Sequence, residues 1–97
     1  MKILVIKKDE FIKIGEDSIT LLGVNIGKDF ALGIIESKVY REGVYRSGNL
    51  IFLGEAKVKM EAKSLMSKKI RFFIEAPLEV KIILGRPNAN PNAEAKR

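Results

Sequence analysis

The chain has 97 residues, of which 46% are hydrophobic, and a formal net charge of +6 from 18 Lys and Arg against 12 Asp and Glu. This length allows one small domain. Because cysteine and histidine are both absent, disulfide bonds, thiolate metal ligands and the catalytic triads that need either residue are excluded. Apolar runs such as Ile3 to Ile6 are far shorter than the ~20 residues of a membrane helix. We expect a cytoplasmic protein with no membrane segment and no signal peptide.

Short runs rich in Val, Ile, Phe and Tyr follow one another along the chain, and glycines separate them. This pattern predicts strands and an all-β fold. We expect strands at 2–7, 18–24, 29–35, 38–45, 56–62, 68–75 and 79–84, with short extended pieces at 11–14 and 50–53. Since the run from Ile3 to Ile6 is apolar throughout, we expect both of its faces to be covered.

Two interpretations compete for the segment 55–68. Its Ala, Lys, Glu and Met residues are good helix formers, which favours a helix. The alternation Lys57-Val-Lys-Met-Glu61 instead indicates a strand with one solvated face and one core face. Alignment of this segment with Ile19 to Gly23 favours the strand.

A short pattern occurs twice in the chain. Ile12-Lys-Ile-Gly-Glu-Asp recurs 39 residues later as Ile51-Phe-Leu-Gly-Glu-Ala, and the run 30–34 aligns with 70–74. One copy is too short to bury a core, so two copies indicate a pseudo-symmetric structure. We expect one domain at 1–86, built from half-repeats at about 1–46 and 47–86. The tail 87–97 has two prolines, three asparagines and no large apolar residue, so we expect it to be disordered.

In order and spacing, these elements resemble the carbon storage regulator (Csr/Rsm) family of small bacterial proteins, which bind messenger RNA as interlocked homodimers. The run 1–8 looks like the family's first strand, and Glu10 followed by Ile14-Gly-Glu-Asp17 resembles its first turn. In the first half, Val39-Tyr-Arg-Glu42 is similar to the family's final strand with its arginine. In the second half, Ala76-Pro77 is similar to the family's Ala-Pro loop. The resemblance covers roughly residues 1–84.

The resemblance implies a small interlocked antiparallel β-sandwich or barrel in which one chain imitates the family's dimer. It implies a post-transcriptional regulator that binds GGA-containing hairpin loops in mRNA leaders and blocks or modulates translation. Partners would be mRNA or a small regulatory RNA, and a protein antagonist. The chain would be a monomer acting as a pseudo-dimer, with a homodimer left open. The net charge suits an RNA partner, although many proteins carry such a charge only for solubility.

The family builds each RNA-binding face from the first strand of one subunit and the last strand of the other. By position, Leu4 would pack against a base, while Lys7 and Lys8 would supply positive charge. Arg46 falls where a second copy of the first strand would carry its basic residue. The candidate RNA-binding residues are Leu4, Lys7, Lys8, Val39, Arg41 and Arg46. For Leu4 the alternative role is core packing, and for Lys7, Lys8 and Arg46 an ordinary solvated charge.

Some positions depart from the family pattern. Leu84 stands where the second half would carry its arginine, and Ile6 replaces a basic residue. These departures favour an alternative function, a diverged protein-binding module that has lost RNA recognition. A structural β domain without a ligand is a further alternative.

The acidic pairs Asp9-Glu10 and Glu16-Asp17 fall at turns, where carboxylates are commonly just solvated. Neither pair has the ligand number or spacing of a calcium site. We therefore expect neither a metal nor a cofactor, and no enzymatic activity.

Overall fold

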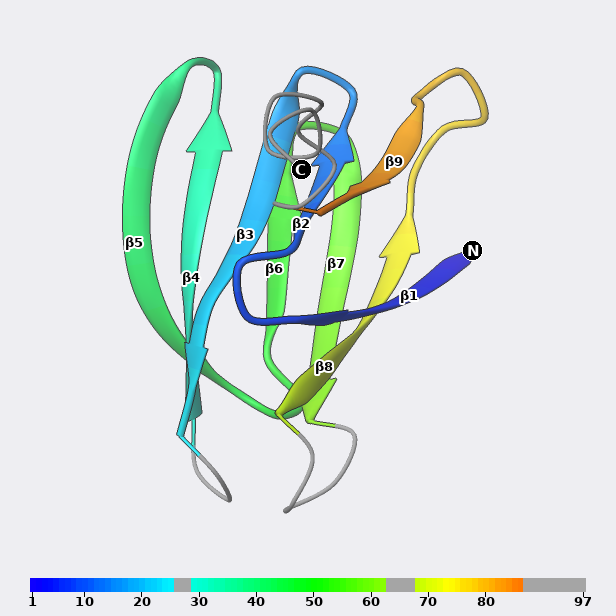
Figure 1. The fold of residues 1–97 in the computed structure, drawn as a ribbon. Coiled ribbons are helices and arrows are strands. Elements are labelled where there is room, and N and C mark those ends of the chain that lie inside the picture. Colours follow the sequence, from blue (N-terminus) through cyan, green and yellow to red (C-terminus); the bar gives the residue numbers. More distant parts are fainter. Residues whose placement is uncertain (26–28, 63–67, 87–97) are drawn as a thin grey trace, which may run out of the picture.

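The computed structural model describes residues 1–25, 29–62 and 68–86. All regular elements in these ranges are β-strands, which confirms the all-β prediction (Figure 1). No helix in this part of the chain could span a membrane. In chain order the strands are β1 (Lys2–Lys7), β2 (Phe11–Ile14), β3 (Asp17–Val24), β4 (Asp29–Glu36), β5 (Val39–Arg46), β6 (Leu50–Leu53), β7 (Ala56–Ala62), β8 (Lys69–Glu75) and β9 (Ile82–Gly85).

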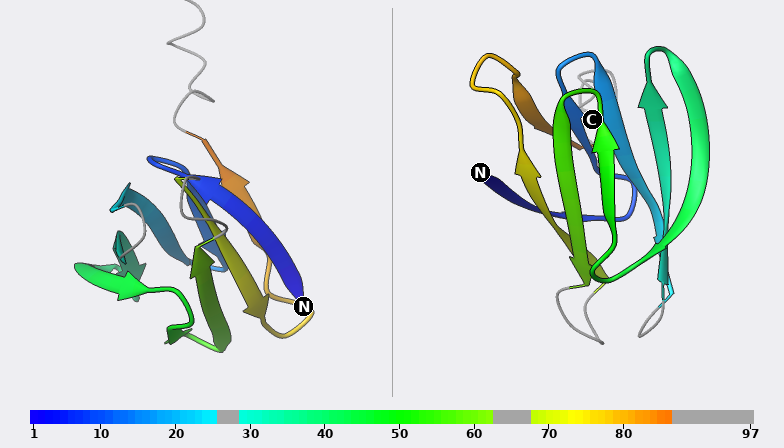
Figure 2. Two further views of the ribbon diagram at one scale, coloured as in Figure 1. Left: turned by 90° about the horizontal axis from the view of Figure 1, so that it is seen from below. Right: turned by 180° about the vertical axis from the view of Figure 1, so that it is seen from behind.

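Two antiparallel sheets form a sandwich (Figures 1 and 2). One sheet has the order β1-β8-β7-β6, and the other has the order β5-β4-β3-β2-β9. Apolar side chains from both sheets form one core, in which Leu32 of β4 and Phe72 of β8 are completely buried. Strand alternation thus sends one set of side chains to the core and the other to the two outer faces.

The two halves of the chain exchange strands. β1 pairs with β8 of the second half, and β9 pairs with β2 of the first half. Neither sheet is therefore made from one half alone, and the repeat completes a single core as its short length requires.

The position of β5 corrects one expectation. Phe30 of β4 and Ile70 of β8 are equivalent positions of the repeat. Tyr45 of β5 lies opposite Phe30, and Ile6 of β1 lies opposite Ile70, so β5 and β1 are equivalent strands. The segment 38–45 was expected to be the last strand of the first half, but it occupies the first-strand position of the second half. By strand position the halves divide at residues 37–38 and not after residue 46.

The turn between β4 and β5 explains this arrangement. Ser37 and Lys38 have φ values of 52° and 69°, as the tight two-residue turns of β-hairpins require. Such a turn folds β5 back onto β4, whereas the longer connection 76–81 carries the chain from β8 to β9 in the other sheet. As a result β2 has β9 on its outer side, but its equivalent β6 pairs only with β7 among the described residues.

The other sequence expectations have mixed outcomes. The strand interpretation of 55–68 is confirmed over β7, while residues 63–67 and the tail 87–97 lie outside the described residues. The expectation that both faces of Ile3 to Ile6 are covered is wrong, because Ile3 is 55% exposed. β1 is the edge strand of a sheet whose outer face has no layer over it among the described residues.

Candidate nucleic-acid interface

The structure separates the residues that the sequence proposed as one RNA site. β1 and β5 are edge strands of different sheets, and in Figure 1 β5 forms the left-hand edge while β1 runs from the right across the front. Leu4, Lys7 and Lys8 therefore lie far from Val39 and Arg41. Leu4 is half-buried and packs against the core, which fits its alternative role.

Arg41 belongs to a surface network at the other edge. Its Nη1 lies 3.0 Å from Oε1 of Glu36, and both side chains are partly exposed. The backbone N–H of Gly54 donates to Oε2 of the same carboxylate at 3.1 Å. The Gly54 hydrogen bond, followed by that from Arg41, lowers the pKa of Glu36. Arg41 thus helps to connect the β4–β5 turn with the β6–β7 turn.

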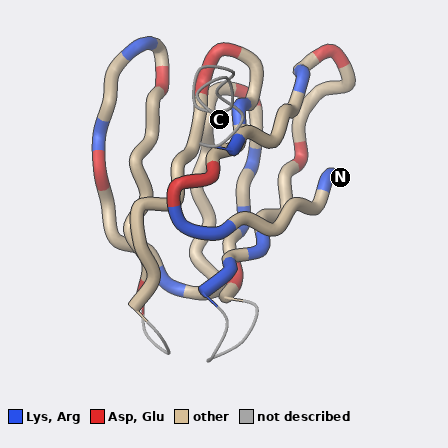
Figure 3. The backbone as a smooth tube through the Cα atoms, viewed as in Figure 1, with Lys and Arg blue, Asp and Glu red and all other residues tan. Residues whose placement is uncertain are grey.

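Five cations gather where β1 ends and β8 begins. Lys7 lies directly opposite Lys69, and Arg71 lies between Val5 of β1 and Glu61 of β7. The tube in Figure 3 shows the basic segments at the end of β1 and the start of β8. Lys8 follows Lys7 and Lys68 precedes Lys69, and both are exposed. We call this group the cation cluster: Lys7, Lys8, Lys68, Lys69 and Arg71. Like charges directly opposite each other destabilise a sheet.

A buried carboxylate fixes the backbone at this cluster. Glu10 is only 6% exposed, and its Oε1 accepts a 2.9 Å hydrogen bond from the backbone N–H of Lys7. Its Oε2 lies 3.3 Å from Nε of Arg86, just beyond β9. The expectation that Glu10 is simply solvated is therefore wrong. Glu10 holds the end of β1 near the end of β9, and Arg86 adds an exposed cation there.

The pseudo-symmetric strand pair, β5 with β4, carries no such cluster. Arg46 takes the place of Lys7, but it lies opposite Asp29, where the first pair has Lys69. Ala31 stands where the first pair has Arg71. One cation and one acid therefore replace three cations. The fold places two equivalent sites, and only one of them is cationic.

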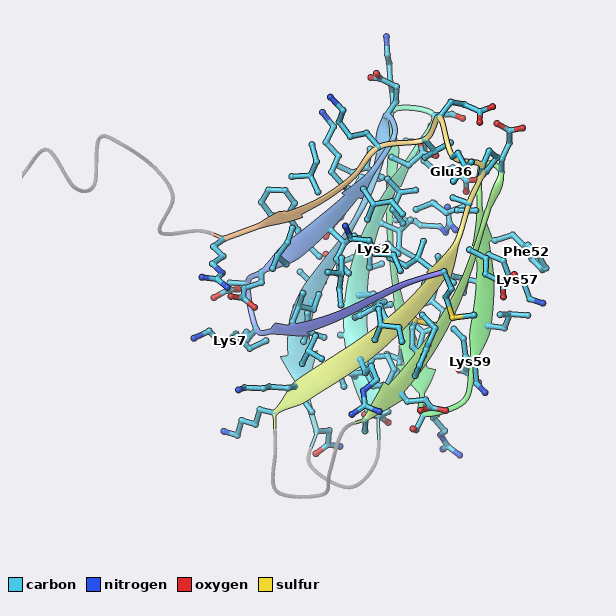
Figure 4. All side chains as sticks on the ribbon, turned by 90° about the vertical axis from the view of Figure 1, so that its right-hand side faces the viewer. Lys2, Lys7, Glu36, Phe52, Lys57 and Lys59 are labelled. Atoms are coloured by element: carbon cyan, nitrogen blue, oxygen red, sulfur yellow. The ribbon has the colours of Figure 1, made fainter. Side chains whose placement is uncertain are left out.

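A groove of about 330 Å³ lies on the outer face of the four-stranded sheet. Phe73 lines it and lies opposite Ile3, two residues along each strand from the pair formed by Val5 and Arg71. Lys57 and Lys59 line its β7 side, and in Figure 4 they extend on the same side of the molecule as Phe52. The other lining residues are Met1, Leu50, Glu61 and Glu75.

Sequence reasoning missed this groove and three of the five residues of the cation cluster. The alternation in 57–61 marked Lys57 and Lys59 as solvated, and the same alternation in 69–75 places Lys69, Arg71 and Phe73 on one face. The signal was present, but it does not say that β8 lies beside β1.

Comparisons with known proteins add no relative. No family model, curated protein or solved structure matches the chain. In the described ranges, no group of three or more acidic side chains could hold a metal ion.

Proposed function

We propose that this protein is a post-transcriptional regulator that binds GGA-containing hairpin loops in mRNA leaders, or small regulatory RNAs, in the cytoplasm and blocks or modulates translation. The cation cluster is the observation that carries this proposal. It offers hydrogen-bond donors and positive charge at one end of one pair of strands, and phosphate groups are the ligands that such an arrangement attracts.

The exchange of strands gives further support. In the family that the sequence resembles, a first strand and a last strand from different subunits form each RNA-binding face. Here β1 pairs with the second half, β9 pairs with the first half, and Glu10 connects the ends of both strands. The equivalent edge at β5 has no last strand beside it among the described residues. The proposal is therefore one RNA site per chain.

Fluorescence anisotropy with a GGA hairpin and a hairpin of scrambled loop sequence tests the proposal. Lys8→Ala should weaken binding of both hairpins and reduce the slope of log affinity against log salt by roughly 0.7–1, because one phosphate contact is lost. Lys13→Ala, at an exposed position on β2 of the other sheet, is the matched control and should leave both quantities unchanged. Titration should give one hairpin per chain.

Two results would contradict the proposal. One is the absence of hairpin binding at low salt. The other is an equal effect of Lys8→Ala and Lys13→Ala, since this would mean that net charge alone attracts the RNA.

One observation favours the alternative protein-binding function. Leu84, at the family's arginine position, lies opposite Ile12 and packs partly against the core. β9 therefore presents no guanidinium at this position. If the chain has this alternative function, the GGA hairpin should bind no better than the scrambled hairpin, and both should dissociate at moderate salt.

A further inference from the structure

The pair of strands that carries the cation cluster changes character along its length. On the outer face, successive opposite pairs are Lys7 with Lys69, Val5 with Arg71, and Ile3 with Phe73. Each step of two residues covers about 6.6–6.8 Å along a strand. The outer face of this strand pair is thus charged at Lys7 and Lys69, and apolar and aromatic at Ile3 and Phe73.

The groove begins at this apolar end. Phe73 lines it together with Met1 and Leu50, which provide further apolar surface. Phe73 is only half-buried although it belongs to an inner strand, because no layer of the described chain covers this face. An aromatic ring beside a row of cations is the arrangement that binds single-stranded nucleic acid, since bases stack on the ring while phosphates contact the cations.

The polar residues of the groove match the edge of a base. Glu61 and Glu75 offer carboxylate oxygens, and Lys57 and Lys59 offer donors. Nζ of Lys59 lies 3.5 Å from Oε2 of Glu61, and Lys57 lies opposite Glu75 on the neighbouring strand. Carboxylates accept hydrogen bonds from exocyclic amino groups such as N4 of cytosine, and uracil has no such group.

We propose that this groove holds an unpaired, amino-bearing base stacked on Phe73, in an RNA whose phosphates lie on the cation cluster. This inference rests on the proposed RNA-binding function and assigns it a base-binding site. The occupant follows from the continuity of the β1–β8 pairs with the cluster and from the carboxylates at the rim. The site selects adenine, cytosine or guanine over uracil.

Anisotropy titrations with labelled single-stranded RNAs of equal length, one of uridines only and one of cytidines only, test this inference. The cytidine RNA should bind the natural protein more tightly. Phe73→Leu should weaken binding of the cytidine RNA by about five- to 160-fold, the range for loss of one stacked base, and should leave the salt slope unchanged. Phe52→Leu is the matched control, because Phe52 is 65% exposed on β6, at the edge of the same sheet, and does not line the groove.

A second variant tests the carboxylate. Glu75→Gln replaces an acceptor-only group by one that can also donate to uracil O4, so the preference for cytidine over uridine should decrease. Circular dichroism checks that each variant is folded.

The outcomes separate this inference from the proposed function. RNA binding that depends on Lys8 but is unaffected by Phe73→Leu overturns the base site and leaves the function standing. Equal losses in the Phe73→Leu and Phe52→Leu variants also overturn it. Absence of RNA binding at low salt overturns the function itself. Equal binding of uridine and cytidine RNA by the natural protein contradicts the selectivity.

Discussion

The two pseudo-symmetric strand pairs, β1 with β8 and β5 with β4, differ in charge although their registers correspond. The first pair, with the residue just beyond β1, carries Lys7, Lys8, Lys69 and Arg71. The corresponding residues of the second pair are Arg46, Ser47, Asp29 and Ala31. Four cations at the first pair thus correspond to one cation and one acid at the second. Arg86, just beyond β9, adds a further cation beside the first pair.

The interior does not show this difference. Phe72 and Leu32 occupy equivalent inward positions of β8 and β4, and both are completely buried. Burial of apolar surface in both halves holds the sandwich together. The comparison teaches that inward positions preserve the repeat, while outward positions give one end a chemistry that the other lacks.

The largest effect is expected where the two halves are alike. Phe72→Ala should lower the free energy of unfolding by about 3–5 kcal/mol and Leu32→Ala by about 2–5 kcal/mol, because each leaves a cavity in the shared core. Urea unfolding followed by circular dichroism should show one transition for both variants. Two separate transitions would mean that the halves unfold independently and that the core is not shared.

A smaller change in the free energy of unfolding should have opposite signs for variants of Lys7 and of Arg46. Lys7→Thr removes one of two like charges that lie opposite each other, so the free energy of unfolding should rise by roughly 0.2–1 kcal/mol. Arg46→Thr removes a cation that lies opposite Asp29 and should lower the free energy of unfolding by roughly the same amount.

RNA affinity measured on the same two proteins completes this test. It should fall for Lys7→Thr and stay unchanged for Arg46→Thr. A loss of stability together with a loss of affinity in the Lys7 variant would show that this lysine supports the fold and is not kept for a ligand.

The smallest effect concerns Glu36 at the β4–β5 turn. Its folded-state pKa is lowered from 4.5 by the hydrogen bonds from Gly54 and Arg41, so its contribution is present above that value. The contribution should disappear as the pH falls through the lowered folded-state pKa. The difference in urea midpoint between the natural protein and Glu36→Gln should therefore shrink from about pH 6 to about pH 3. A difference in urea midpoint that stays constant over this pH range would mean that Glu36 does not contribute to the pH dependence of stability.

Much of the secondary structure was predictable from sequence because β-branched and aromatic runs mark strands locally. The position of β5 was not, because it depends on the turn at Ser37 and Lys38. Neither residue is a glycine, and nothing in their identity indicates their positive φ. The resemblance therefore placed Arg41 beside the first strand, while the turn places it at the opposite edge.

The candidate site was predictable only in part for a similar reason. Lys7 and Lys8 could be proposed from their own strand. Lys69 and Arg71 join them only through pairing between residues more than 60 positions apart, which strand periodicity does not specify. The ion pair between Glu10 and Arg86 likewise joins residues far apart in the chain.

The strand β6 has a consequence for solubility. Its sequence Leu50-Ile-Phe-Leu53 contains no charge, and Leu50 and Phe52 are 44% and 65% exposed. Its outer edge has no neighbour within the described residues, whereas the equivalent strand β2 has Lys13 and is covered by β9. Natural proteins protect such edges with charge, because unpaired backbone groups can join another chain. At high concentration, sheet extension between molecules should therefore begin at β6, and one lysine at position 50 or 52 should raise the concentration that the protein tolerates.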